Sequence, residues 1–121
     1  MKVGFIGLGN VGGKLAWSLL RNNFDLTVRD LDKNLTQSFK NSGAKVANSP
    51  KELAEQVDLI ITCLPSPKIC AEVMEASDGV INGLSENKIW LEMSTTDEAE
   101  IKRISKKIIS KKAIPLDGPV S

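Results

Sequence analysis

Histidine and tyrosine are absent from this chain of 121 residues, and cysteine occurs only at Cys63 and Cys70. The absence of histidine removes the commonest general acid–base group and much of zinc chemistry. Two cysteines are too few for a disulfide framework, and their spacing is not that of metal ligands. We therefore expect no metal site and no redox role for either thiol.

An excess of charge of one sign and long apolar runs are also lacking. The 16 Lys and Arg residues nearly balance the 15 Asp and Glu residues, so neither nucleic acid nor an anionic membrane is an expected partner. No apolar run approaches the roughly 20 residues that cross a bilayer. Residues 1–7 have the pattern of a strand rather than of a signal or transit peptide. We expect one domain, in the reducing cytoplasm.

Short apolar strands alternate with amphipathic helices along the whole chain. Strands are expected at 2–7, 25–30, around 46, 59–64, 89–93 and 114–117. Helices are expected at 10–21 and around 35–39, the second of which stops at 41–43. A third follows the capping box at 49–52, and a fourth follows Ser66-Pro67 and buries Val73 and Met74. A fifth has a buried stripe of Ile101, Ile104, Ile108 and Ile109. This alternation predicts an α/β fold with a doubly wound, mainly parallel sheet.

The first strand leads into the sequence Gly7-Leu8-Gly9-Asn10-Val11-Gly12, which matches G-x-G-x-x-G. A strand before it and a helix after it are the context in which this motif binds a dinucleotide. Gly7 allows the tight turn, Gly9 lets the backbone approach a diphosphate, and Gly12 lets the helix pack closely. The free amides at the helix start would then bind the anion. The alternative is a merely tight connection between strand and helix.

Asp30 ends the second strand, 18 positions after Gly12. An acidic residue about 20 positions on accepts hydrogen bonds from the adenosine ribose and disfavours a 2′-phosphate, so NAD is favoured and NADP is possible. Arg29 could accommodate that phosphate, but alternation along the strand is expected to point it away. Asp32 is expected to cap the following helix.

Three later segments should gather at the edge of the sheet where the glycine turn lies, because each follows the carboxyl end of a parallel strand. They are Thr62-Cys63-Leu64-Pro65, Ser94-Thr95 and Asp117-Gly118-Pro119-Val120-Ser121. Together with the glycine turn, these motifs occur in the order seen in the β-hydroxyacid dehydrogenases, and the chain resembles that family over its whole length. The resemblance is strongest to the 3-hydroxyisobutyrate dehydrogenases and the tartronate semialdehyde reductases, and it implies a Rossmann-like fold.

The resemblance implies roles for individual residues in the later loops. Leu64 and Pro65 correspond to residues beside the adenosine and ribose of the cofactor, and Thr95 to one that reaches the nicotinamide half. Ser121 corresponds to the serine that holds the substrate's carboxylate. Leu64 could instead be only core at a strand end, and Thr95 could begin a capping box over 95–98.

The resemblance also implies that catalysis needs residues outside this sequence. In the family, a lysine of an all-helical second domain transfers the proton, and that domain builds the dimer. No lysine here lies in that motif, so no catalytic residue is assigned in this chain. We expect residues 1–121 to be the NAD(P)-binding domain of a longer, homo-oligomeric enzyme and to be inactive alone.

The favoured hypothesis is hydride transfer between NAD(P) and a small β-hydroxyacid, such as 3-hydroxyisobutyrate, and its semialdehyde. Two alternatives remain open. One is a reductase of imines or other carbonyl compounds from the same superfamily, and the other is a non-catalytic NAD(P)-binding regulatory module.

Overall fold

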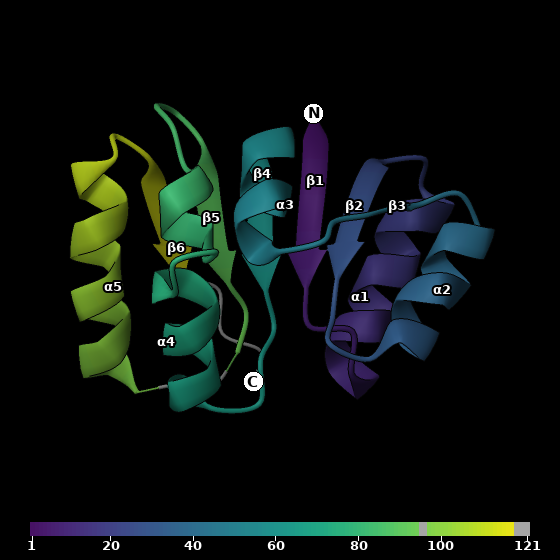
Figure 1. Cartoon of the computed structure of the whole chain (residues 1–121), viewed down its shortest axis with the longest axis horizontal. Helices are drawn as coiled ribbons and strands as arrows, with labels where there is room; N and C mark the ends of the chain where they lie inside the picture. The colour runs from purple at the N-terminus through teal and green to yellow at the C-terminus, as the bar shows by residue number, and fades with distance from the viewer. Residues whose placement is uncertain (95–96, 118–121) are drawn as a thin grey trace.

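A computed structural model describes residues 1–94 and 97–117. Within them, parallel strands form one six-stranded sheet in the order β3-β2-β1-β4-β5-β6, with β1 and β4 at its centre (Figure 1). The strands are β1 (Lys2–Ile6), β2 (Asp25–Arg29), β3 (Lys45–Val46), β4 (Leu59–Thr62), β5 (Ile89–Glu92) and β6 (Ile114–Asp117). The predicted doubly wound parallel fold is confirmed, and the order reverses direction between β1 and β4.

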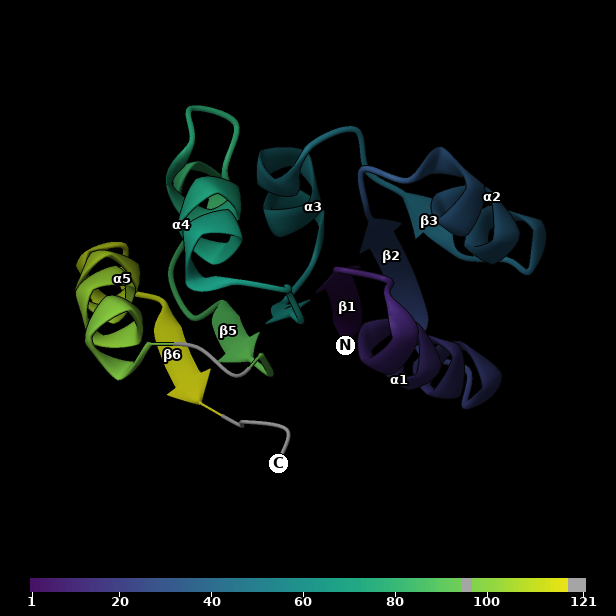
Figure 2. The same cartoon turned by 90° about the horizontal axis from the view of Figure 1, so that it is seen from below.

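Helices cover both faces of this sheet (Figure 2). They are α1 (Asn10–Arg21), α2 (Lys33–Asn41), α3 (Pro50–Gln56), α4 (Pro67–Glu75) and α5 (Glu98–Ser110), with a short 3-10 helix, η1 (Val80–Gly83). The helices α1 and α2 pack on one face, and α3, α4 and α5 pack on the other. Among the described residues, no helix is both long enough and apolar enough to cross a membrane.

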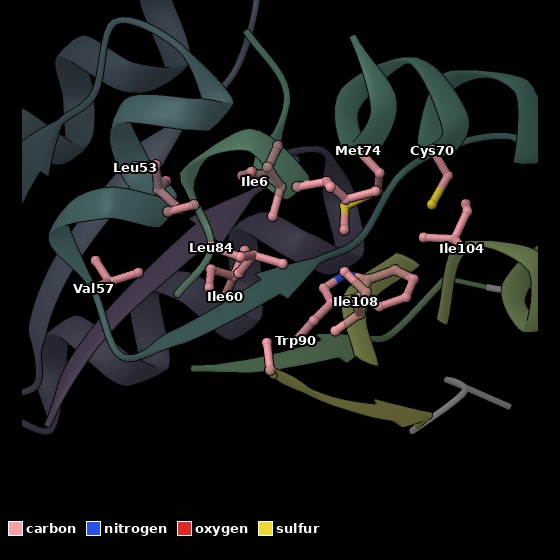
Figure 3. Packing of buried hydrophobic residues seen from close by; sticks show 14 of the residues in the cluster. Ile6, Leu53, Val57, Ile60, Cys70, Met74, Leu84, Trp90, Ile104 and Ile108 are labelled. Carbon is pink, nitrogen blue, oxygen red and sulfur yellow. The ribbon is translucent and has the colours of Figure 1, made fainter. Parts of the chain in front are cut away.

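Two apolar clusters, one on each face of the sheet, form the core. Under α3, α4 and α5, Trp90 is fully buried with Met74 and Ile104 (Figure 3). Under α1 and α2, the rings of Trp17 and Phe39 stack with their centroids 4.1 Å apart. Burial on both faces explains why the central strands are almost uniformly apolar.

Several strand ends and one helix face differ from the sequence-based expectations. The strand β1 ends at Ile6 because Gly7 has a φ of 100°, and β4 and β5 end at Thr62 and Glu92. The expectation that Ile109 is buried is wrong, since it is 59% exposed while Ile108 is fully buried. Successive helical residues are rotated by about 100°, which carries Ile109 off the buried stripe.

Side chains cap the N-termini of four helices. Ser49 Oγ accepts the Glu52 N–H, which is half of the predicted capping box, but the Glu52 carboxylate accepts from Asn48 rather than Ser49. The caps of α2, α4 and α5 are Asp32, Ser66 and Asp97. The Asp97 carboxylate accepts from the first turn of α5, which begins at Glu98, and Thr95, the other candidate for a capping box, lies outside the described residues.

An ion-pair network on the surface joins α4 to α5 and should make stability depend on pH. Arg103 forms two bonds to the Glu75 carboxylate, at 2.7 and 2.5 Å, and Lys107 contacts the same group. The Arg103 hydrogen bonds are the largest cause that lowers the pKa of Glu75, from 4.5 to about 2; burial, the next in size, opposes them, and the hydrogen bond from Lys107 lowers the pKa further.

Glu75→Gln is expected to lower the melting temperature by about 3 °C at pH 7. A lowered pKa stabilises the fold fully above pH 4.5, and this contribution disappears as the pH falls through about 2. Thermal unfolding of both proteins should therefore converge at the lowest pH. Glu86→Gln, at an exposed glutamate, serves as the control. A difference in melting temperature between the Glu75→Gln protein and the original chain that persists below pH 2 would contradict the ion-pair explanation.

Candidate functional site

A cavity of about 870 Å³ lies beyond the carboxyl ends of β1, β2 and β4. This volume is typical of small-molecule sites, and the position at the reversal of strand order is where α/β sheets bind ligands. Most of the residues predicted to contact a cofactor line it together: Gly7, Gly9, Asn10, Val11, Gly12, Asp30, Leu64 and Pro65. The structure thus brings the glycine turn, the end of β2 and the loop after β4 to one place.

The glycine turn has the geometry that its sequence predicts. A Cβ on Gly7 would overlap the carbonyl oxygen of Cys63, and one on Gly12 would overlap the carbonyl oxygen of Gly7. These contacts bring the start of α1 against the end of β4. A Cβ on Gly9 would meet nothing within 4 Å, so the backbone there is open to the cavity.

The N-terminus of α1 differs from those of the other α-helices. Within the described residues its N-cap, Gly9, supplies no side-chain hydrogen bond, whereas side chains cap α2, α3, α4 and α5. The first amides of a helix need acceptors, and they carry the positive end of the helix dipole. An anion in the cavity would supply those acceptors.

Asp30 links β2 to the glycine turn. Its Oδ2 accepts the Leu8 N–H at 2.7 Å, and its Oδ1 accepts the Asp32 N–H at 2.9 Å. Leu8 therefore contributes its amide to the bond that joins the glycine turn to Asp30, while its side chain is buried. No local sequence pattern indicates this link, because it joins residues 22 positions apart. Asp32 caps α2 by accepting the Asn34 N–H, as expected.

Apolar side chains form much of the cavity wall. Leu31 is 87% exposed and lines the cavity with Ile69 and Val11, which are exposed as well. Leu31 and Ile69 were not predicted as site residues. The position of Leu31 directly after Asp30 could have indicated that it lines the cavity. Leu64 lines the cavity and also packs against the cluster under α4, so its packing in the core does not take it away from the cavity wall.

Neither thiol has the lowered pKa that a nucleophilic or redox-active cysteine needs. Burial, followed by the charge of Glu92, raises the pKa of the Cys63 thiol. Burial and Glu92 also raise the pKa of the thiol of Cys70, a buried residue of α4. Within residues 1–94 and 97–117, no group of three or more acidic or thiol side chains is placed to hold a metal ion.

Comparison with known protein families identifies the family to which the chain belongs. A family described as the NAD binding domain of 6-phosphogluconate dehydrogenase matches residues 2–121. The chain belongs to this family. It is an NAD(P)-binding domain, and its cavity has the uncapped helix start and the acidic residue at the end of β2 that such a cofactor requires.

Several relatives of this NAD(P)-binding domain, both curated proteins and solved structures, are named as oxidoreductases. Mouse mitochondrial 3-hydroxyisobutyrate dehydrogenase is 36% identical over 119 residues, which are 98% of this chain and 36% of the relative. The crystal structure of 3-hydroxyisobutyrate dehydrogenase from Salmonella typhimurium has a TM-score of 0.91 at 27% identity, covering 100% of this chain and 42% of its own. The resemblance predicted from the motifs is confirmed. The domain spans about a third of the mouse relative's length.

A third similar protein is named for another activity. The structure of an imine reductase from Pseudomonas sp. has a TM-score of 0.87 at 25% identity, covering 98% of this domain and 40% of the relative.

Two of the predicted site residues, Thr95 and Ser121, lie outside the described residues.

The charges around the cavity of this NAD(P)-binding domain are mainly negative. Its lining includes four carboxylates, which are Asp30, Asp32, Glu72 and Asp78. Arg29 also belongs to the lining, so the expectation that strand alternation takes it away from the site is not confirmed.

Proposed function

We propose that this domain binds the cofactor of an enzyme that interconverts a small β-hydroxyacid, such as 3-hydroxyisobutyrate, and its semialdehyde. The observation that carries the proposal is the N-terminus of α1, which opens into the cavity without a side-chain cap. In the proposed complex, the cofactor's diphosphate accepts hydrogen bonds from the free amides at the start of α1, over 9–12. Asp30 accepts hydrogen bonds from the adenosine ribose.

The remaining site residues would orient the nicotinamide and the substrate. Leu64 and Pro65 contact the cofactor after β4, Thr95 reaches its nicotinamide half, and Ser121 binds the substrate's carboxylate. The bound cofactor supplies the hydride chemistry, and these residues position it and exclude water. No residue of this chain is assigned a catalytic proton transfer. The proton-transferring lysine that the family resemblance implies would come from a further helical domain, which would also form the homo-oligomer.

We propose that the domain prefers NAD to NADP. A 2′-phosphate placed beside Asp30 would lie among the carboxylates of the lining, with Arg29 as the one basic side chain there among the described residues. At short range, like charges in a partly desolvated site repel each other strongly.

The alternative is that the substrate is an imine. The similarity to an imine reductase, at 25% identity, favours this alternative.

Titration of the chain with NADH and, separately, NADPH tests this function. We expect saturable binding of NADH, seen as enhanced nicotinamide fluorescence, and binding of NADPH that is about tenfold weaker. The chain alone should not reduce methylmalonic semialdehyde. Absence of binding by either cofactor would overturn the proposal, and turnover by the chain alone would overturn the assignment of catalysis to another domain.

A further inference from the structure

The carboxylate of Glu92, at the end of β5, is fully buried. Among the described residues it is the one charged side chain in the interior, and nothing in the proposed function so far uses it. Burying a carboxylate is unfavourable unless hydrogen bonds replace its hydration. Its surroundings therefore need an explanation.

Hydrogen bonds from three directions satisfy the two oxygens of Glu92. Oε2 accepts from the hydroxyl of Thr62 at 2.5 Å and from the thiol of Cys70 at 3.4 Å. Oε1 accepts the Ser94 N–H at 2.5 Å. Thr62 is the partner of Glu92 in the β4–β5 register, and its hydroxyl accepts from the Trp90 indole at 3.0 Å. The carboxylate thus fixes the side chains at the ends of both strands.

A second link carries this arrangement into the cofactor cavity. The Met93 N–H donates to the Thr62 carbonyl as β5 ends. One residue further on, Ser94 Oγ accepts the Leu64 N–H at 2.5 Å. Glu92 holds the backbone of Ser94, and Ser94 holds the backbone of Leu64, which lines the cavity. Ser94 therefore joins the loops after β4 and β5, and the buried carboxylate holds Ser94 in place.

We propose that Glu92 is a positioning residue for the cofactor, which acts through Ser94 to set the backbone of Leu64 in the wall of the cavity. The inference rests on the proposed function, because it assumes that this cavity holds NADH. Loss of the carboxylate would also leave the Thr62 hydroxyl and the Ser94 N–H without an acceptor, so an effect on stability has to be separated from an effect on the cofactor.

A set of matched variants separates positioning from stability. Glu92→Met fills the same space without an acceptor for the Ser94 N–H, and Ser94→Ala removes the acceptor of the Leu64 N–H. Each is expected to raise the Kd for NADH about tenfold, the effect of losing one well-placed hydrogen bond. The double variant should lose no more than either single variant, because both act in one chain of contacts.

Two further variants distinguish this role from core packing. Glu92→Gln keeps an oxygen for the Ser94 N–H and is expected to restore the affinity to within about twofold of the original. Cys70→Ala removes a Glu92 partner that belongs to α4, so it should alter the melting temperature and leave the Kd unchanged. A Glu92→Met protein that melts like the original yet binds NADH weakly would establish the role.

Hydrogen exchange of the Leu64 amide in the cofactor-free chain provides a second readout. Exchange is expected to be about tenfold faster in Glu92→Met and in Ser94→Ala, and unchanged in Cys70→Ala. If Glu92→Met does not fold, the Ser94→Ala protein decides the question. Unchanged NADH affinity and unchanged Leu64 exchange in the folded variants would overturn the inference. Failure of the original chain to bind NADH would overturn the proposed function instead, and the exchange rates would still test the positioning.

Discussion

Replacing Gly9 by aspartate is expected to stabilise the fold and to abolish NADH binding. Gly9 is the N-cap of α1, its backbone is extended with a φ of −67°, and a Cβ there meets no atom within 4 Å. An aspartate N-cap is favoured over a glycine N-cap by a few tenths of a kcal/mol, or about 1–2 °C in melting temperature. The same carboxylate would occupy the amides proposed for the diphosphate and repel it, which raises the Kd at least about hundredfold.

Gly9→Asn is the matched control, because asparagine caps a helix about as well as aspartate and carries no charge. Its affinity for NADH should fall between those of the original chain and the Gly9→Asp protein. Thermal unfolding and fluorescence titration measure the two effects on the same samples. A Gly9→Asp chain that binds NADH with an unchanged Kd would show that the diphosphate lies elsewhere.

Replacing Asp30 by asparagine is expected to remove the preference for NADH. The two carboxylate oxygens accept from the amides of Leu8 and Asp32, and an asparagine side chain has only one oxygen. The ribose would lose a charged acceptor, which weakens NADH binding by about ten- to a hundredfold. NADPH should bind as well as before or better, because one negative charge has left the site.

Asp32→Asn tests whether the Asp30 effect is one of position or only of charge. It removes one carboxylate from the same lining and keeps a good N-cap for α2. The Kd for NADH should stay within about twofold of the original. If the two variants change the NADH-to-NADPH ratio equally, the ribose role of Asp30 is wrong.

The sequence was most informative where one local segment determines the structure. The turn over 7–12 needs glycine at Gly7 for a positive φ and at Gly12 for close packing, and both needs follow from the motif alone. Strand and helix alternation predicted the parallel sheet in the same way. The sequence alone therefore predicts that the residues of the motif and of the loop after β4 lie together at one edge of the sheet.

The features that the sequence did not reveal depend on contacts between distant segments. The bond from Leu8 to Asp30 spans 22 positions, and that from Thr62 to Glu92 spans 30. An acidic residue in the apolar strand over 89–93 has no local pattern that marks it as buried. Ile109 shows the same limitation on a helix, because its exposure is set by where α5 meets the sheet.

The central claim is that the cofactor's diphosphate lies on the N-terminus of α1. The most direct test follows the backbone amide signals of the isotopically labelled chain during titration with NADH. We predict the largest shifts at Gly9, Asn10 and Val11, with smaller ones at Asp30 and Leu64. Saturable binding that leaves the amides of 9–11 unmoved would contradict the account.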